Sequence, residues 1–477
     1  MKSTVNFLDA VLFYLAQTFR ALGDHPAALA WYRRRISAGG RADEIWYSHY
    51  SIGLLHAEAG QTRASIRALR EAIRLDPSRP EPFYQLARHL RERGRMLFAT
   101  RCARRGLALP VSRYGKLFLE QDVLDWGLLQ ELSLAAFFTR FRPEGLAANE
   151  RLALGAAVPG DVSAVAQASS ILYARPLPDA VYHEIAPDLP EGLHPCNPSI
   201  LRTREGYLVC CRCVSYRLDE RQRYESTRPD GVLGTRNFLL RMDRSFRQTD
   251  QRELVWEEPP RRPSRVQGLE DARLVEVGGA LAFTCTTADL HPDGPLRISL
   301  FSLDSGGRIL RHVPLTGHGD GQTQKNWLPF SDPGTGELRA VYGYEPILVL
   351  GIDPATGRCA PVVERHQGRP FDRFRGSAGP VRLPESAGGG TLLLVHEVAF
   401  HGQRDYLHRF LEVESDWRVV RASRPFFFLH RGIEFASGAC LDHDGETLLI
   451  TLGVEDGEAW LCRVPLRTVR DLLEPLP

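Results

Sequence analysis

From about residue 195 onward, the chain repeats one local pattern, in which short runs of β-branched and aromatic residues end at glycine, aspartate or proline. Such runs are typical of β-strands joined by tight turns. The clearest runs are 207–213, 237–242, 280–286, 297–303, 338–344, 391–398, 406–413, 447–453 and 459–464. About 280 residues of this kind exceed one ordinary β-sandwich and suit a propeller of five four-stranded blades, roughly 55 residues each.

The first third of the chain has a different period. Up to about residue 155 it is rich in Ala, Leu, Arg and Glu, with apolar residues at helical spacing. Tyr50 and Tyr84, and Gly60 and Gly94, are each 34 positions apart. This spacing resembles the tetratricopeptide repeat, which stacks pairs of antiparallel helices. The resemblance implies either a protein-docking groove or a rigid support for the domain that follows.

Between these regions, residues 156–192 contain Val158-Pro159-Gly160 and Arg175-Pro176-Leu177-Pro178. This shift in composition predicts a linker. The expected fold class is therefore multidomain, α plus all-β. The predicted parts are tetratricopeptide-repeat-like helices over 1–155, a linker over 156–192 and a five-bladed β-propeller catalytic domain over 193–477.

Composition gives little indication of a special partner. The net charge of +2 does not call for nucleic acid or a membrane surface. Residues 6–15 are apolar but contain Asp9, which fits an amphipathic helix better than a signal peptide. The nine cysteines are odd in number, lack the spacing of a zinc site and suit a reducing cytoplasm. We expect no metal and no cofactor beyond a co-substrate such as phosphate.

Polar clusters recur where the predicted strands begin. In a propeller the innermost strand of each blade lines the axis, so one cluster per blade converges on one cavity. Carboxylates, arginines and aromatic rings together suit a polyhydroxylated ligand that carries or exchanges phosphate. The clusters include Asn197, Arg236 with Asn237, Glu270 with Asp271 and Arg273, Lys325 with Asn326 and Trp327, Arg375, His396 with Glu397, Tyr406 with His408 and Arg409, and Glu434.

The order of four of these motifs resembles glycoside hydrolase family 130, which holds inverting β-mannoside phosphorylases and mannosidases on five-bladed propellers. The fold of that family is also similar to that of glycosyltransferase family 108, which makes mannan. The motifs are Asn197-Pro198-Ser199-Ile200, Glu270-Asp271-Ala272-Arg273, Lys325-Asn326-Trp327-Leu328-Pro329-Phe330 and Gly432-Ile433-Glu434-Phe435. Ala272 stands where the family motif has proline, and the likeness covers roughly residues 190–465.

The resemblance implies roles for several of these residues. Asp271 would be the general acid, and Arg273 would orient Asp271 or the ligand. Lys325 would contact phosphate and Asn326 a sugar hydroxyl. Trp327 would stack on a sugar or pack in the core. The second arginine usual in the phosphorylases is replaced here by Val341-Tyr342-Gly343-Tyr344, so an anion pocket must use other cations. Arg375, His408 and Arg409 are the candidates.

Several functions stay open at this level. Glu397 or Glu434 can supply a base to activate water or an acceptor, or can be structural. An inverting hydrolase needs two carboxyls, whereas a phosphorylase needs only the acid because phosphate is the nucleophile. We expect phosphorolysis or glycosyl transfer from a sugar phosphate or activated sugar, with Asp271 as general acid/base. The alternatives are a protein- or peptide-directed glycosyltransferase whose repeats dock the acceptor, and a non-catalytic propeller that binds a glycan or a protein.

Overall fold

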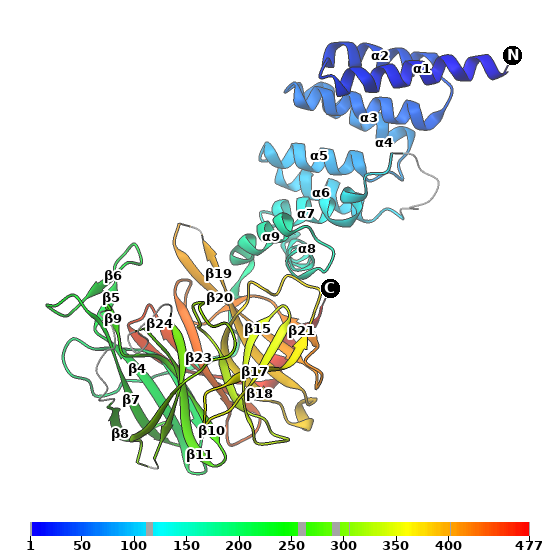
Figure 1. The fold of residues 1–477 in the computed structure, drawn as a ribbon. Helices are drawn as coiled ribbons and strands as arrows, with labels where there is room; N and C mark the ends of the chain where they lie inside the picture. The colour runs from blue at the N-terminus through cyan, green and yellow to red at the C-terminus, as the bar shows by residue number, and fades with distance from the viewer. Residues whose placement is uncertain are drawn as a thin grey trace. The chain divides into compact units, whose positions relative to one another are not determined.

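The computed structural model describes residues 2–110, 118–255, 264–288, 296–304, 306–400 and 402–476. Two compact units make up the chain, Met1–Tyr173 and Ala174–Pro477 (Figure 1). The first unit is helical and the second consists mainly of antiparallel β-sheets. None of the helices in these ranges is both long and apolar enough to cross a membrane.

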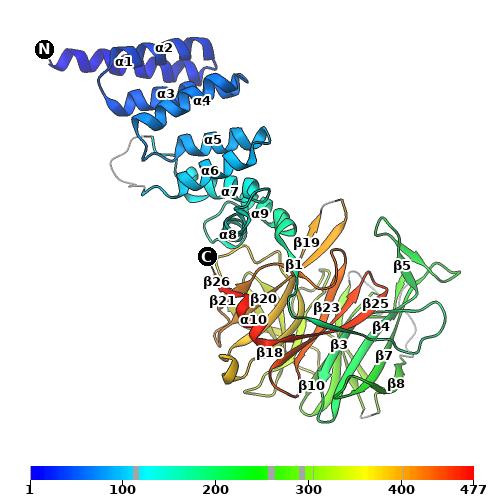
Figure 2. The same ribbon diagram turned by 180° about the vertical axis from the view of Figure 1, so that it is seen from behind.

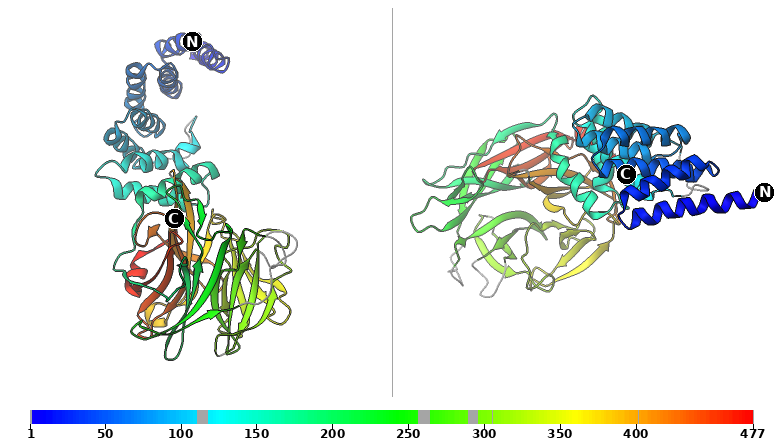
Figure 3. Two further views of the ribbon diagram at one scale, coloured as in Figure 1. Left: turned by 90° about the vertical axis from the view of Figure 1, so that its left-hand side faces the viewer. Right: turned by 90° about the horizontal axis from the view of Figure 1, so that it is seen from above.

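The first unit begins with three helical hairpins, which the left view of Figure 3 shows stacked pair upon pair. Gly23, Gly60 and Gly94 separate the two helices of each pair at φ of 77°, 70° and 72°. This left-handed backbone explains the recurring glycine. The helices of the unit are α1 (Lys2–Ala21), α2 (His25–Ala38), α3 (Ala42–Glu58), α4 (Thr62–Leu75), α5 (Glu81–Glu92), α6 (Met96–Leu107), α7 (Leu128–Ala136), α8 (Arg142–Leu154) and α9 (Gly160–Tyr173).

Small residues set the spacing of these helices. A Cβ on Gly53 would come within 2.8 Å of the Leu69 side chain, and one on Gly106 would come equally close to Leu128. Larger residues there would separate the helices. The helical nature of the first region is thus confirmed, and its assignment to the tetratricopeptide class stays a prediction.

The predicted linker, residues 156–192, is wrong as a structural description. Its first half forms α9, which buries Val162 and Ala166 in the core of the helical unit. Its second half contains β1 (Arg175–Pro176) and β2 (Val181–Glu184), both paired within the second unit. The prolines that suggested a linker lie at the ends of these short elements, where proline is tolerated.

The second unit has five main sheets, and Figure 2 shows the strands of the first of them side by side. In four sheets the chain runs from the innermost strand outward. The main strands are β3 (His194–Arg202), β4 (Gly206–Val214), β7 (Leu233–Asp243) and β8 (Gln248–Leu254); β10 (Leu269–Val277), β11 (Ala280–Thr287), β12 (Arg297–Leu303) and β13 (Ile309–Pro314); β14 (Leu328–Ser331), β15 (Leu338–Tyr344), β16 (Ile347–Ile352) and β17 (Cys359–Arg365); β18 (Arg375–Arg382), β19 (Thr391–Phe400), β20 (Arg404–Val413) and β21 (Val419–Ser423); β23 (Glu434–Leu441), β24 (Thr447–Val454) and β25 (Glu458–Pro465).

The sheets close into a ring. The innermost strands contact one another in the order β3, β10, β14, β18, β23 and back to β3. The fifth sheet takes its outer strand from the start of the unit, because β2 pairs with β25 from Val181 opposite Arg463 to Glu184 opposite Trp460. Joining first and last segments in one sheet fixes the ring without an open edge. The predicted five-bladed propeller is confirmed.

Apolar cores lie between neighbouring blades. One joins the first and second sheets through Leu239, Leu274 and Phe283, and another joins the fourth and fifth through Phe410 and Ile450. Cys210, Cys211 and Cys213 are buried in such cores, as small strand residues. All nine cysteines belong to the described part of the chain, and none of them is in a disulfide. Within the same residues no group of three or more His, Cys, Asp or Glu could hold a metal.

Candidate active site

A cavity of about 330 Å³ lies where the innermost strands begin. Its volume is within the range of small-ligand sites. Eight of the predicted site residues line it: Asn197, Glu270, Asp271, Lys325, Asn326, Arg375, His396 and Tyr406. These residues come from the first, second, third and fourth blades, so the radial arrangement does bring them together.

Asp271 is held ionised at the centre of this set. Its Oδ1 accepts hydrogen bonds from Arg212 Nη1 at 2.8 Å and Asn197 Nδ2 at 3.0 Å. Burial alone would raise the pKa of Asp271, but Arg212, Asn197 and the more distant Lys325 and Arg273 outweigh it and lower the pKa. The carboxylate therefore carries its negative charge at neutral pH.

The backbone aims these side chains by unusual conformations. Asn197, Asp271, Asn326 and Asp456 have φ of 41°, 52°, 61° and 49°. The ladders of β3 and β10 shift register around Asn197 and Asp271, so each lies in a bulge. Bulges re-aim side chains, and left-handed backbone at non-glycine residues concentrates at functional sites.

Glu270 completes an ion-pair network beside Asp271. Its carboxylate lies 3.5 Å from Arg212 Nη2 and 3.2 Å from Lys325 Nζ. Arg212 also donates to the hydroxyl of Tyr216 at 2.9 Å. Lys325 keeps 41% of its side chain exposed, so its ammonium can contact both Glu270 and a ligand in the cavity.

Asp456 shares the cavity with Asp271 but has a different environment. It lies in the turn between β24 and β25. Burial raises the pKa of Asp456 to about 6, with repulsion from Asp271 and Glu270 adding to the effect of burial and Arg212 and Arg404 opposing it. Two carboxyl groups with separated pKa values thus line one cavity, a pattern typical of acid–base sites.

His396 is a neutral member of the wall. Its Nδ1 is 2.8 Å from Ser377 Oγ, its ring stacks on Tyr406 at 5.1 Å, and Phe435 packs edge-on against it at 5.2 Å. Burial, together with nearby His408 and Arg375, lowers the pKa of His396 well below its usual value. The neutral ring can exchange hydrogen bonds with a ligand without adding charge.

Arg273 does not line the cavity and instead spans the propeller axis. Its Nη1 donates to the carbonyl of Ser437 at 3.2 Å and to that of Ser377. It therefore links the second blade to the fourth and fifth. Burial lowers the pKa of Arg273, with Asp271 opposing this effect.

Strand alternation places two predicted residues, Glu397 and Glu434, away from the cavity. Neighbouring residues on a strand point to opposite faces, so where His396 and Phe435 face the cavity, Glu397 and Glu434 cannot. Glu397 lies between Arg409 Nε at 3.0 Å and Arg373 Nε at 3.2 Å, and Arg409 is fully buried.

Glu434 accepts from the backbone N–H groups of Phe428, Leu429 and His430 at 2.6, 2.7 and 2.9 Å, which shapes the preceding turn. These contacts favour structural roles for both glutamates and for Arg409 over the base and anion contacts that we expected.

The other predicted residues also lie outside this cavity. Arg236 forms an exposed ion pair with Glu253, and Asn237 donates to the Leu269 carbonyl at 2.8 Å. Trp327 is 3% exposed and belongs to an inter-blade core, in agreement with its packing alternative. His408 is fully buried, and burial lowers its pKa to about 3, which excludes a cationic role at neutral pH.

Sequence reasoning missed Arg212, Tyr216, Tyr224, Arg404 and Asp456, all of which line the cavity. Arg212 was detectable, because it is the one charged residue within the apolar run 207–214. A charge inside a buried strand needs a partner and so marks a site. Asp456 lies in Glu455-Asp456-Gly457, which has the composition of an ordinary hairpin turn and gives no such signal.

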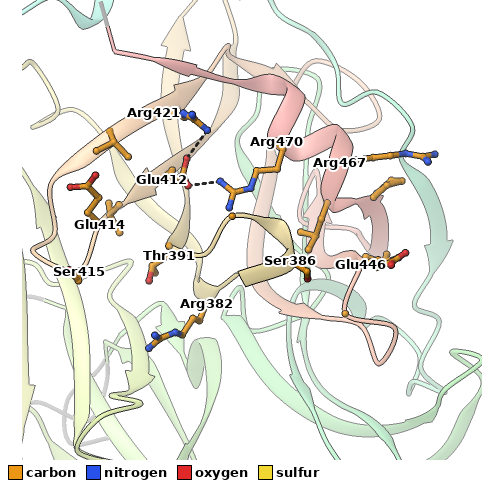
Figure 4. Close-up of a pocket in the computed structure, with 18 of the residues that line it drawn as sticks. Arg382, Ser386, Thr391, Glu412, Glu414, Ser415, Arg421, Glu446, Arg467 and Arg470 are labelled. Carbon is orange, nitrogen blue, oxygen red and sulfur yellow. Dashed lines mark hydrogen bonds and ion pairs between the residues drawn. The ribbon is translucent and has the colours of Figure 1, made fainter. Parts of the chain in front are cut away.

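A larger cavity, of about 1310 Å³, lies among β18–β21, β24 and α10 (Leu466–Leu472) (Figure 4). It contains none of the predicted site residues. Figure 4 shows Glu412 between Arg421 and Arg470, an ion pair on each side. The charge of Glu412 is therefore already balanced by two arginines. The volume of this cavity alone does not mark the cavity as a reaction site.

Comparison with solved structures finds other proteins of similar fold. The β-1,2-mannobiose phosphorylase from Listeria innocua is 14% identical over 62% of this chain and 99% of that one, with a TM-score of 0.44. MPT-1, a GDP-Man-dependent mannosyltransferase from Leishmania mexicana, is 13% identical over 63% and 93%, with a TM-score of 0.40. MPT-4, a mannose phosphorylase from the same organism, is 11% identical over 65% and 95%, with a TM-score of 0.38. No family model matches the chain. No curated protein matches it either.

Proposed function

We propose that the propeller transfers a glycosyl group between an alcohol and phosphate or a phosphate ester, with inversion at the anomeric carbon. The observation that carries this proposal is the cavity shared by Asp271, held ionised, and Asp456, whose pKa is about 6. The cavity is lined by three carboxyl groups and by four basic side chains, Arg212, Lys325, Arg375 and Arg404.

The cations favour an anionic co-substrate. Arg375 forms no ion pair within the described residues, and Lys325 is only partly occupied by Glu270. A guanidinium without a partner at a cavity wall suits a phosphate oxygen, to which it can donate two hydrogen bonds. Tyr224 and Tyr406 add apolar ring surface that suits a sugar face.

The two carboxyls divide the chemistry. In phosphorolysis, the Asp456 carboxyl gives its proton to the departing glycosidic oxygen as a phosphate oxygen bonds to the anomeric carbon from the opposite face. In the reverse direction, phosphate leaves and the Asp456 carboxylate takes the proton of the attacking hydroxyl. Asp271, ionised throughout, stabilises the positive charge that develops on the sugar. This division differs from our expectation that Asp271 donates the proton.

The decisive assay runs in the synthetic direction. The protein is incubated with a panel of sugar 1-phosphates and alcohol acceptors, and the released phosphate is measured. We expect phosphate release with at least one donor and a glycoside product whose anomeric configuration is opposite to that of the donor. Neither phosphate release nor glycoside product should be seen with Asp271→Asn or Asp456→Asn. Binding of sugar phosphates without turnover, with both variants binding as the wild type does, would instead support a non-catalytic propeller.

A further inference from the structure

In the helical unit, a short segment of the chain lies against α1, α3 and the start of α5. The ring of Phe118 is 4.3 Å from that of Tyr47 on α3 and 5.5 Å from that of Phe13 on α1. Two residues later, the carboxyl of Glu120 lies near enough to Tyr50 on α3 for each group to shift the pKa of the other. Helix α1 and helix α3 thus contact the aromatic ring of this segment, and α3 also lies beside its carboxyl.

Arg79 and Glu81 also form hydrogen bonds with the backbone of this segment. Arg79 Nη2 donates to the Phe118 carbonyl at 3.0 Å, and Glu81 Oε1 accepts from the Glu120 N–H at 3.4 Å. Arg79 and Glu81 are themselves paired at 2.7 Å and buried, and the guanidinium of Arg79 lies 3.6 Å from the Trp46 ring centre. A buried ion pair that offers one donor and one acceptor to a peptide backbone can hold any chain in that position.

The resident segment fits imperfectly. Phe118 has φ of 60°, a strained conformation for a bulky residue, and 38% of its surface stays exposed. Burial and the neighbouring Glu81 raise the pKa of Glu120, since its negative charge is disfavoured there. A free peptide with the same side chains but a relaxed backbone would avoid the first of these costs.

We propose that this surface of α1, α3 and α5 is a peptide-binding site occupied in cis by Phe118–Glu120. A partner segment with an aromatic residue two positions before a carboxylate competes for it. The partner is a protein with such a segment exposed, and the resident residues keep the site closed in its absence. This role is independent of the chemistry in the propeller.

Removing the resident ring opens the site to a peptide in trans. The full chain carrying Phe118→Ser is titrated into a labelled peptide of the sequence of residues 115–123, Gly-Lys-Leu-Phe-Leu-Glu-Gln-Asp-Val, and fluorescence anisotropy is followed. We expect binding at least tenfold tighter than for the wild type, and a rise in the thermal midpoint of the variant on adding peptide. A peptide with alanine in place of its phenylalanine should give neither effect.

Two further variants control the experiment. Phe138→Ser removes a phenylalanine that is 63% exposed and outside this surface, so it should bind peptide as weakly as the wild type. Phe118→Ser combined with Arg79→Gln should lose the gained binding. Phe118→Leu, which keeps an apolar side chain, replaces Phe118→Ser if circular dichroism shows that the serine variant is unfolded. Folded Phe118 variants that bind no peptide, or bind it as the wild type does, would overturn the proposal.

Discussion

The two large cavities of the propeller differ in what they contain, and volume is the less informative property. The outer cavity has about 1310 Å³ and the axial one about 330 Å³. In the outer cavity Glu412 is neutralised by an arginine on each side. In the axial cavity Arg375 has no such partner within the described chain, Asp456 is repelled by other carboxylates, and four residues have left-handed backbone.

This difference indicates that backbone strain and unbalanced charge, both of which cost stability, are concentrated in the axial cavity. Strain and unbalanced charge persist only when the surrounding fold enforces them, and they become useful when a ligand relieves them. In a cavity whose charges are already paired, a bound ligand relieves no strain or charge imbalance and gains no binding energy from such relief. The comparison predicts that substitutions at the axis change turnover, whereas substitutions in the outer cavity change stability alone.

The largest expected effect is that of Asp271→Asn. Removing this negative charge takes away the stabilisation of the charged sugar, and we expect kcat to fall about 10³-fold, equivalent to about 4 kcal/mol. Arg212 keeps Glu270 as a partner, so the thermal midpoint should change little. Phosphate release from the active sugar phosphate is the measurement. A loss of less than tenfold in a folded variant would remove Asp271 from the reaction.

Asp456→Asn should cost about 10²-fold, the usual contribution of a general acid or base. The direction of the pH dependence in the wild type tests the role of Asp456 more strictly than the size of this loss. With a pKa of about 6, wild-type phosphorolysis, which needs the protonated carboxyl, should decline as pH rises through 6. Synthesis, which needs the carboxylate, should decline as pH falls through 6. Rate profiles from pH 4.5 to 8 test both limbs, and their persistence in the variant would assign them to another group.

Arg375→Ala should raise the KM for phosphate about tenfold with little change in kcat, because the guanidinium binds ground state and transition state alike. Arg382→Ala is a matched control at the other end of the same strand, β18, in the outer cavity. We expect it to leave the KM unchanged. Equal effects of the two variants would mean that overall positive charge, not the axial position, attracts the anion.

Much of this arrangement follows from local sequence. The strand-and-turn pattern predicts blades, and polar residues at strand starts converge because innermost strands surround the axis. Alternation along a strand then decides between neighbours such as His396 and Glu397, and the register that sets it is not visible in the sequence. Asp456 and the ring closure by β2 depend on contacts between distant segments, so no local pattern indicates them.

The smallest effect on turnover is expected from Glu412→Gln, which nevertheless tests the comparison most directly. The carboxylate is 7% exposed and lies 3.7 Å from Arg421, with Arg470 hydrogen-bonded to its other oxygen. Glutamine leaves two guanidinium groups without a counter-charge, so we expect a loss of about 2 kcal/mol of stability. Denaturant unfolding followed by far-UV circular dichroism measures this loss. Because Glu412 lines the outer cavity and does not line the axial one, turnover in the folded variant should stay within about twofold of wild type. A larger drop would show that the two cavities are coupled.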